Sequence, residues 1–266
     1  MYSRILVGTD GFGPAAAAVA RAAGLAKVTG AELIVLHAYA PPDSVYGLPR
    51  PPQPGIDAAQ GVLDDAAAKH ADGISLRTEL RQGEPAEELV AAAQEEGADL
   101  VMVGNVGMRS RFTLGSVPNQ VSHHAPCDVW IVNTAEGPRP LSNRVVVGVD
   151  GSERALRALA AAARLAALHD AELAVVYVHW QDEDATSDEI LQQACSTVES
   201  TGVRLSTRVE IGDPAEALIR TAETEGVDVL VVGNKGMTGV QRFLLGNVPN
   251  KISHHAPCDL LIVRTS

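Results

Sequence analysis

The strongest constraint on the fold of this chain is an internal repeat that spans almost its whole length. Residues 4–11 read RILVGTDG, and residues 144–151 read RVVVGVDG. Towards the end of each copy, residues 117–132 and 248–263 are identical at 12 of 16 positions. A repeat unit this long is a whole domain rather than a solenoid module.

The repeat therefore predicts two domains of the same fold. The first covers residues 1–133 and the second residues 144–266, with a linker at residues 134–143. The linker is polar and contains two prolines and a glycine, which are typical of a connection between domains.

Within each copy, short runs of Val, Ile and Leu alternate with longer Ala-rich stretches. The short runs predict buried strands at residues 4–9, 32–38, 99–103, 128–132, 144–149, 172–178, 227–232 and 259–263. Alternating stretches predict half-exposed edge strands at 75–81 and 203–210. Helices are expected at about 14–28, 57–72, 85–96, 153–169, 186–201 and 214–225. Strands that alternate with helices indicate an α/β fold in which a parallel sheet carries helices on both faces.

Composition narrows the classes of partner. The formal net charge of −12 disfavours nucleic acid and anionic membrane as partners, and no apolar run reaches the length of a membrane span. Three cysteines are too few for a disulfide framework, so we expect a protein of the reducing cytoplasm. Backbone amides can still bind small anions locally.

Two features follow strands whose carboxyl ends should face a ligand. Asp10 and Asp150 each follow the first strand of a copy, with a glycine after them. A glycine-rich loop follows the fourth strand and leads into a short helix that begins with Ser116 or Asn247. Glycines let amides approach a phosphate, and the helix start adds a positive dipole end. The basic residues of these loops are Arg109, Arg111, Lys235 and Arg242.

These motifs resemble those of the universal stress proteins in their tandem two-domain form. Nucleotide-binding members carry Gly-x-x-Gly, nine residues and a further Gly before Ser or Thr, and Gly233, Gly236 and Gly246 match that spacing. The resemblance implies two flavodoxin- or Rossmann-like domains, each a five-stranded parallel sheet, paired as a pseudo-dimer through their last strands. It also implies binding of ATP or ADP, with or without Mg.

The resemblance assigns candidate nucleotide-binding residues to both copies. Asp10 and Asp150 would contact the adenosine part, and the backbone at Ala38 and Val178 would face adenine. The phosphates would lie against Gly104, Gly107, Gly115, Ser116 and Val117, or against Gly233, Gly236, Gly239, Gly246, Asn247 and Val248. Gly8 and Gly148, which precede the aspartates in the strands, complete the candidate set.

The two copies depart from the pattern differently. The first loop has seven residues between Gly107 and Gly115, two fewer than the second, and the first turn lacks the serine that follows Gly151. Asn247 stands where the family prefers a hydroxyl residue, and we expect its amide oxygen to cap the helix. The second copy is therefore the stronger candidate site.

A second repeated motif, Ser-His-His-Ala-Pro-Cys-Asp at 122–128 and 253–259, has a zinc reading and a structural one. Adjacent histidines on a helix point in different directions and no Cys-x-x-Cys is present, so we assign no metal. The structural reading is a helix end, where histidine complements the dipole and proline stops the helix.

The sequence contains no motif of a kinase, P-loop enzyme or hydrolase, so we expect a binding protein rather than an enzyme, with slow ATP hydrolysis left open. The leading hypothesis is a nucleotide-dependent stress-response or regulatory protein. The alternatives are a cAMP-binding protein and an interaction scaffold that binds no nucleotide. The protein partner is unknown, and a further homodimer is left open. The Pro-rich stretch at 41–54 is expected to be a stiff solvated excursion, with a lid or a peptide-binding segment as the alternatives.

Overall fold

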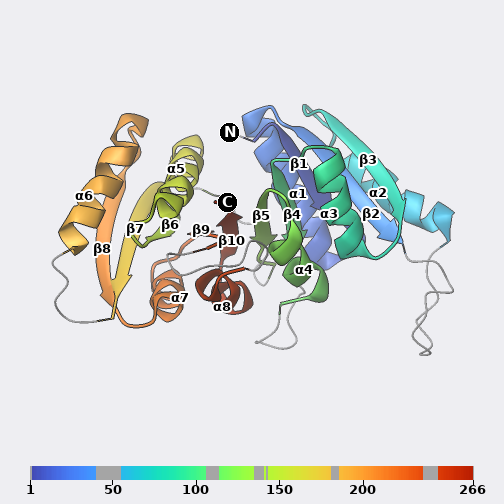
Figure 1. The fold of residues 1–266 in the computed structure, drawn as a ribbon. Coiled ribbons are helices and arrows are strands. Elements are labelled where there is room, and N and C mark those ends of the chain that lie inside the picture. Colours follow the sequence, from blue (N-terminus) through green and yellow to red (C-terminus); the bar gives the residue numbers. More distant parts are fainter. Residues whose placement is uncertain are drawn as a thin grey trace, which may run out of the picture. The chain divides into compact units, whose positions relative to one another are not determined.

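Each half of the chain forms a five-stranded parallel sheet with the strand order 3-2-1-4-5. The computed structural model describes residues 2–39, 55–105, 114–134, 141, 143–180, 186–235 and 245–265. The described chain divides into two compact units: an N-terminal unit with β1–β5 and α1–α4, and a C-terminal unit with β6–β10 and α5–α8 (Figure 1). The sheet orders within the units are β3-β2-β1-β4-β5 and β8-β7-β6-β9-β10.

The elements of the two units correspond one to one, apart from a short 3₁₀ turn after α6. The N-terminal unit consists of β1 (Arg4–Gly8), α1 (Gly13–Thr29), β2 (Glu32–Tyr39), α2 (Ile56–His70), β3 (Leu76–Gln82), α3 (Pro85–Glu95), β4 (Leu100–Gly104), α4 (Ser116–His124) and β5 (Asp128–Val132). The C-terminal unit consists of β6 (Arg144–Val149), α5 (Glu153–Leu168), β7 (Glu172–His179), α6 (Ser187–Val198), β8 (Leu205–Ile211), α7 (Pro214–Thr224), β9 (Val229–Gly233), α8 (Asn247–His255) and β10 (Asp259–Val263).

The predicted parallel α/β architecture of both halves is confirmed. The apolar runs are central strands: Ile5, Leu6 and Val7 of β1 are fully buried, as are their counterparts Val146 and Val147 in β6. Such runs are buried because helices cover both faces of a parallel sheet. The two alternating stretches form β3 and β8, at the sheet edge where they were expected. Pairing of the halves through their last strands stays a prediction.

Small side chains let the helices pack closely on the sheets. The buried face of α1 includes Ala18, Ala22 and Ala26, and α5 has alanines at the corresponding positions. With few aromatic residues in the chain, aliphatic side chains make up most of the core of each unit, and Trp130 of β5 is fully buried. No helix among the described residues is long and apolar enough to cross a membrane.

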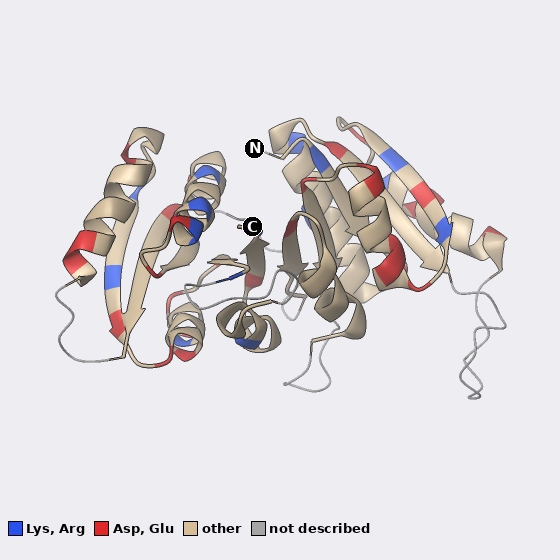
Figure 2. Ribbon diagram, viewed as in Figure 1, with Lys and Arg blue, Asp and Glu red and all other residues tan. Residues whose placement is uncertain are grey.

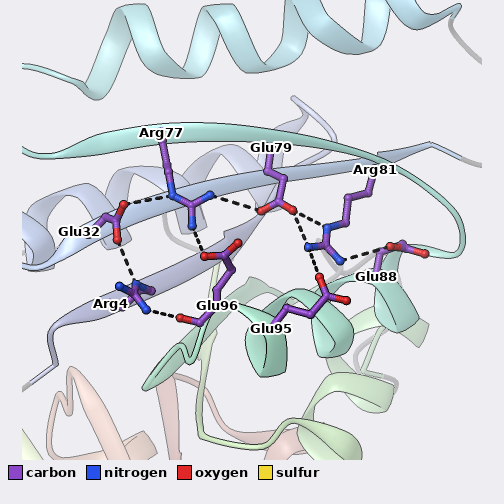
Figure 3. A network of polar contacts seen from close by, with 8 residues as sticks. All are labelled: Arg4, Glu32, Arg77, Glu79, Arg81, Glu88, Glu95 and Glu96. Carbon is purple, nitrogen blue, oxygen red and sulfur yellow. Dashed lines mark hydrogen bonds and ion pairs between the residues drawn. The ribbon is translucent and has the colours of Figure 1, made fainter.

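An ion-pair network fastens the edge strand β3 to the N-terminal unit (Figure 3). Arg77 bridges Glu32 of β2, Glu79 of its own strand and Glu96 after α3. Arg81 contacts Glu79 at 2.6 Å and also reaches carboxylates of α3. The network occupies the charged side chains of β3 with partners inside their own unit.

Candidate functional site

The strand order reverses between β1 and β4 in the N-terminal unit. The chain runs from β1 outward to β2 and β3, and then crosses to β4 on the other side of β1. Parallel sheets bind ligands beyond the carboxyl ends of the strands at such a reversal of order. The C-terminal unit has the same reversal between β6 and β9. Both sequence motifs, the Asp-Gly turn and the glycine loop, follow these four strands.

The aspartate after the first strand is fixed by a turn that leads into the next helix. Asp10 Oδ1 accepts a hydrogen bond from the amide of Phe12 at 2.9 Å, and Asp150 Oδ1 accepts one from the amide of Ser152 at 3.0 Å. In the C-terminal unit the Ser152 hydroxyl also donates to Asp150 Oδ1 at 2.6 Å. The glycines inside the two turns, Gly11 and Gly151, have φ angles of 84° and 79°, a backbone conformation that favours glycine.

Ser152 strengthens the turn in the C-terminal unit because it also caps α5. Its hydroxyl accepts a hydrogen bond from the amide of Ala155 at 3.2 Å. Phe12 has the corresponding position before α1, makes no side-chain cap bond and is 74% exposed. The missing serine of the first copy therefore removes a helix cap.

The glycine that ends the fourth strand brings the loop against the helix that follows the first strand. A Cβ on Gly104 would lie 2.3 Å from the carbonyl oxygen of Pro14 in α1. The corresponding position of Gly233 is roomier: a Cβ there would have Thr265 Cγ2 at 3.4 Å and the Arg154 carbonyl oxygen at 4.0 Å. The two motifs that are far apart in the sequence therefore meet at one edge.

An asparagine after this glycine anchors the loop to the last strand, which the sequence reading missed. Asn105 Oδ1 accepts hydrogen bonds from the amide and the hydroxyl of Thr134, at 3.0 and 2.9 Å. Asn234 Oδ1 accepts the same two bonds from Thr265, at 3.0 and 2.7 Å. The signal was the repeated Gly-Asn pair, with a threonine at the same place in both copies.

The short helix after each loop begins with two backbone amides that have no acceptor among the described residues, and we call these the open amides. Gly115 and Gly246 are the N-cap residues, and neither α4 nor α8 has a side-chain cap bond. The prediction that Asn247 caps α8 is therefore wrong: Asn247 is the first residue inside the helix. The third position of each helix is proline, which has no N–H to offer. Throughout the described chain, no group accepts from the amides of Ser116, Val117, Asn247 and Val248.

The glycine loops of the two units differ at their base. The amide of Gly246 donates to the carbonyl oxygen of Asn234 at 2.9 Å, which joins the two ends of the loop in the C-terminal unit. Gly115 and Asn105 form no such bond within the part of the N-terminal unit that the structure describes. The first loop is two residues shorter, and this difference accompanies the missing contact. The predicted site residues Gly107, Gly236 and Gly239, with Arg109, Arg111 and Arg242, lie outside the described residues.

The remaining predicted residues lie near the same edge, with different surroundings. Gly8 and Gly148 face a helix, since a Cβ there would lie 2.8 Å from a leucine methyl of α3 or α7. Their lack of a side chain thus allows close helix packing. Ala38 and Val178 are half-buried, next to the last residue of β2 and β7.

His37, another residue that the sequence reading missed, has an unpaired buried nitrogen. Its Nδ1 lies 2.7 Å from the carbonyl oxygen of Thr9, which can only accept, so Nδ1 carries the proton. The other nitrogen, Nε2, is buried and has no partner among the described residues. Tyr177 has the equivalent position in the C-terminal unit. His37 therefore supports the strand that precedes Asp10.

The described residues contain no cluster of three or more His, Cys, Asp or Glu side chains suited to a metal ion. In the repeated Ser-His-His motif, His123 and His124 lie in the last turn of α4, with ring centroids 6.2 Å apart. Burial raises the pKa of the Cys258 thiol to about 12, and the neighbouring Asp259 carboxylate contributes to the rise. A thiol with that pKa stays protonated, and so is a poor nucleophile, near neutral pH.

Comparisons with known proteins agree with the repeat. The universal stress protein family matches residues 1–133, 142–194 and 179–264. A universal stress protein of Bacillus subtilis is 31% identical over 146 residues, which are 46% of this chain and 99% of that protein. One of Mycobacterium tuberculosis is 35% identical over 141 residues, covering 46% of this chain and 96% of that protein.

A solved structure extends the likeness to the whole chain. The crystal structure of a universal stress protein from Archaeoglobus fulgidus has a TM-score of 0.79 and covers 99% of this chain and 98% of its own. At 23% identity this likeness concerns the fold. The family match, the relatives that each cover half of the chain, and the two units of one fold lead to one conclusion: the chain is a tandem two-domain member of the universal stress protein family.

Proposed function

We propose that this protein binds an adenine nucleotide, ATP or ADP, in its C-terminal unit and acts as a nucleotide-dependent regulatory protein. The observation that carries the proposal is the closed loop between β9 and α8. Its ends are joined by the bond from Gly246 to Asn234, and it leads directly to the open amides of Asn247 and Val248.

The open amides fit a phosphate group. A helix start offers N–H donors and a partial positive charge, and both favour an anion. The chain's net charge of −12 acts over long distances, and screening by salt limits its effect at a site with its own donors. The phosphates would therefore lie at the start of α8, at the carboxyl end of β9.

The adenosine part would lie on the other side of the reversal in strand order, at the end of β6. Asp150 lies at the end of β6, held by its turn, and offers a carboxylate to hydroxyl or amino groups of a nucleoside. Val178, one strand further along, supplies backbone groups as the family resemblance implies. The order β7-β6-β9 thus matches the order of base, sugar and phosphates.

The N-terminal unit is the weaker candidate. It has Asp10, Gly104 and the open amides of α4, but its shorter loop lacks the bond that joins the loop ends. In the C-terminal unit the bond from Gly246 to Asn234 holds the two ends of the loop before a ligand binds, which lowers the entropy lost on binding there. We therefore expect tighter binding in the C-terminal unit.

The proposed role is binding rather than catalysis. In the turn after β6, Asp150 accepts from two groups of Ser152, which suits a structural or ligand-holding carboxylate better than a general base. The protonated thiol of Cys258 is likewise unsuited to nucleophilic attack. Incubation with Mg²⁺ and ATP should therefore release no phosphate beyond that of a protein-free control.

The substitution Asn247→Asp tests the site with little risk to the fold. An aspartate in the first turn of α8 favours the helix dipole, but its charge repels a phosphate at the same amides. We expect nucleotide affinity to fall about tenfold or more, about 1.4 kcal/mol or more, while the melting temperature stays the same or rises. Isothermal titration with ATP, ADP and cAMP measures the first effect, and thermal unfolding the second.

Two matched variants complete the test. Asn247→Ser keeps the site neutral and should retain binding, whereas Ser116→Asp makes the same charge change at α4 and should affect the C-terminal site little. An unchanged nucleotide affinity in Asn247→Asp would show that the phosphates do not bind at the start of α8. Tighter binding of cAMP than of ATP would favour a cyclic-nucleotide protein, and no uptake of any nucleotide would favour a scaffold.

A further inference from the structure

The edge strand β8 of the C-terminal unit exposes two apolar side chains, whereas the apolar side chains of its counterpart β3 are half-buried. Val209 and Ile211 of β8 are 40% and 49% exposed, whereas Leu80, the β3 residue that corresponds to Val209, is half-buried. The helix that packs on the edge strand is shorter in the C-terminal unit: α6 has 12 residues and α2 has 15. Exposed edge strands are sites of pairing with another chain.

The outer backbone groups of β8 are also open. Two backbone hydrogen bonds at 2.8 Å show which groups of this segment face β7. The carbonyl oxygen of Arg204 accepts from the amide of Leu173, and the amide of Gly212 donates to the carbonyl oxygen of His179. Alternate residues of a parallel strand bond to the same neighbour, so the even-numbered residues of β8 serve β7. The odd-numbered residues direct their N–H and C=O groups outward. Within the described residues these outward groups have no partner at Thr207, Val209 and Ile211.

We propose that β8 pairs antiparallel with β8 of a second copy of this chain, about a two-fold axis at Val209. In this register Val209 lies opposite the partner's Val209, and Thr207 opposite the partner's Ile211. The outward backbone groups are then in phase, because odd-numbered residues lie opposite odd-numbered residues. The pairing adds a strand to each sheet and covers both exposed apolar side chains.

The charges of β8 select this register. Arg208 lies opposite the partner's Glu210, and the symmetry repeats that pair on the other side of the axis. Figure 2 shows the basic and acidic residues along β8. An axis at Arg208 or at Glu210 would instead place like charges directly opposite each other, which destabilises strand pairing. An axis at Thr207 would leave Ile211 opposite chain that lies outside β8.

The corresponding surface of β3 is unsuited to the same pairing. Glu79 and Arg81, which correspond to Arg208 and Glu210, are bound into the network of Figure 3. Their side chains are 20% and 16% exposed, compared with 46% for Arg208 and 24% for Glu210, which also form ion pairs within their own unit. Because one chain contains both edges, β3 is an internal control for every variant of β8.

The dimer should be weak and depend on concentration. A seven-residue strand is about 23 Å long, so strand pairing alone covers less than the roughly 800 Å² per partner of a standard interface. Sedimentation velocity of the full chain over about 10–500 µM should therefore show a shift from monomer towards dimer. A single monomeric species over this range overturns the proposal.

Charge variants test the register. Arg208→Glu and Glu210→Arg each place like charges opposite one another, and each should weaken the dimer about tenfold or more. The double variant Arg208→Glu/Glu210→Arg restores opposite charges across the axis and should restore the dimer. Within their own unit Arg208 also pairs with Glu225, and Glu210 with Arg220, so thermal unfolding must confirm that each variant folds.

Variants at the axis give an answer that does not depend on those ion pairs. Val209→Lys is an exposed substitution that brings two ammonium groups together, and it should leave the protein monomeric. Val209→Cys places two thiols on the axis, at the roughly 5.5 Å Cα separation of a hydrogen-bonded pair, which a disulfide can span. Mild oxidation should give a covalent dimer that neither the parent chain nor Leu80→Cys forms. A dimer that persists in Val209→Lys, or that the double charge variant fails to restore, overturns the register.

Discussion

At the scale of single residues, Gly104 and Gly233 show how one position in a repeat can be glycine for two reasons. Both end the fourth strand of their sheet. At Gly104 the first turn of α1 lies so close that a Cβ would be 2.3 Å from a backbone oxygen. At Gly233 the closest atom, 3.4 Å away, belongs to a side chain. Packing therefore requires the first glycine, whereas a Cβ at the second would make only ordinary van der Waals contacts.

The contrast predicts that Gly104→Ala destabilises the protein and Gly233→Ala does not. Overpacking against a backbone group forces the strand and helix apart, with an expected loss of about 2–3 kcal/mol in the free energy of unfolding. Gly233→Ala should stay within about 0.5 kcal/mol of the parent chain. Urea unfolding followed by circular dichroism measures both. Equal losses in the two variants would show that the two helix–strand contacts are alike.

Residues such as His37 mark a limit of the sequence reading. Eight histidines occur in the chain, and no spacing distinguishes the one whose Nδ1 meets the Thr9 carbonyl. The repeat gives no help, because tyrosine replaces this histidine in the second copy. Its role follows from the pairing of β1 and β2, which brings together residues 28 positions apart.

At the scale of elements, α7 shows what a local signal can determine. Asp213 before Pro214 has the residue types of a helix start, and Asp213 Oδ1 accepts from the amide of Glu216 at 2.9 Å as an N-cap does. Lys251 of α8 also contacts Asp213, at 3.2 Å. This cap therefore connects α7 with the helix proposed to bind phosphate.

Asp213→Ala should lower the free energy of unfolding by about 1 kcal/mol, since it removes the cap. The N-cap residue of α3, Glu84, makes no side-chain cap bond, so Glu84→Ala is the matched control and should cost less. Asp213→Asn keeps a side-chain acceptor, so its loss of unfolding free energy should lie between those of Asp213→Ala and Glu84→Ala. Thermal and urea unfolding at pH 7 rank the three variants. An alanine at 213 that costs no more than one at 84 would mean that the observed cap adds nothing to stability.

The sequence predicted nearly all helices and strands because their signals are local or periodic. Alternation identified the edge strands, and unbroken apolar runs identified the central ones. The starts of α4 and α8 were harder to predict. Ser116 and Asn247 have the composition of caps, yet the preceding glycines hold the N-cap position. The hydrogen bond between Asn234 and Gly246 joins residues at the two ends of a loop, so no local sequence pattern could predict it.

At the scale of the whole molecule, charge has two opposing effects on stability. At pH 7 the net charge is −12, and repulsion among the excess negative charges destabilises the folded chain. This repulsion weakens as the pH falls towards the isoelectric point near 5.1. Each unit also contains a glutamate at the start of its second strand, and the ionised carboxylate of that glutamate stabilises the fold. A hydrogen bond from Arg4 lowers the pKa of Glu32, while hydrogen bonds from Ser206 and then Arg144 lower the pKa of Glu172.

These effects predict how the stability of the fold changes with pH, with a loss of stability at acidic pH. A carboxylate whose pKa is lower in the folded state than its ordinary value of 4.5 stabilises the fold above that value. The contribution is lost as the pH falls through the folded-state pKa. The melting temperature should therefore be level or rise slightly from pH 7 to about 5, and fall below about 4.5.

The double variant Glu32→Gln/Glu172→Gln isolates the contribution of the two carboxylates. Both are about one-third exposed, so solvent screens their ion pairs and the loss at pH 7 should be modest. Below the folded-state pKa the parent carboxyls are themselves neutral, so the melting temperatures of parent and variant should converge. A difference that stays constant from pH 7 to 3 would assign the effect of the variant to altered packing. Convergence would show that one repeated ion pair per unit sets part of the acid limit of the fold.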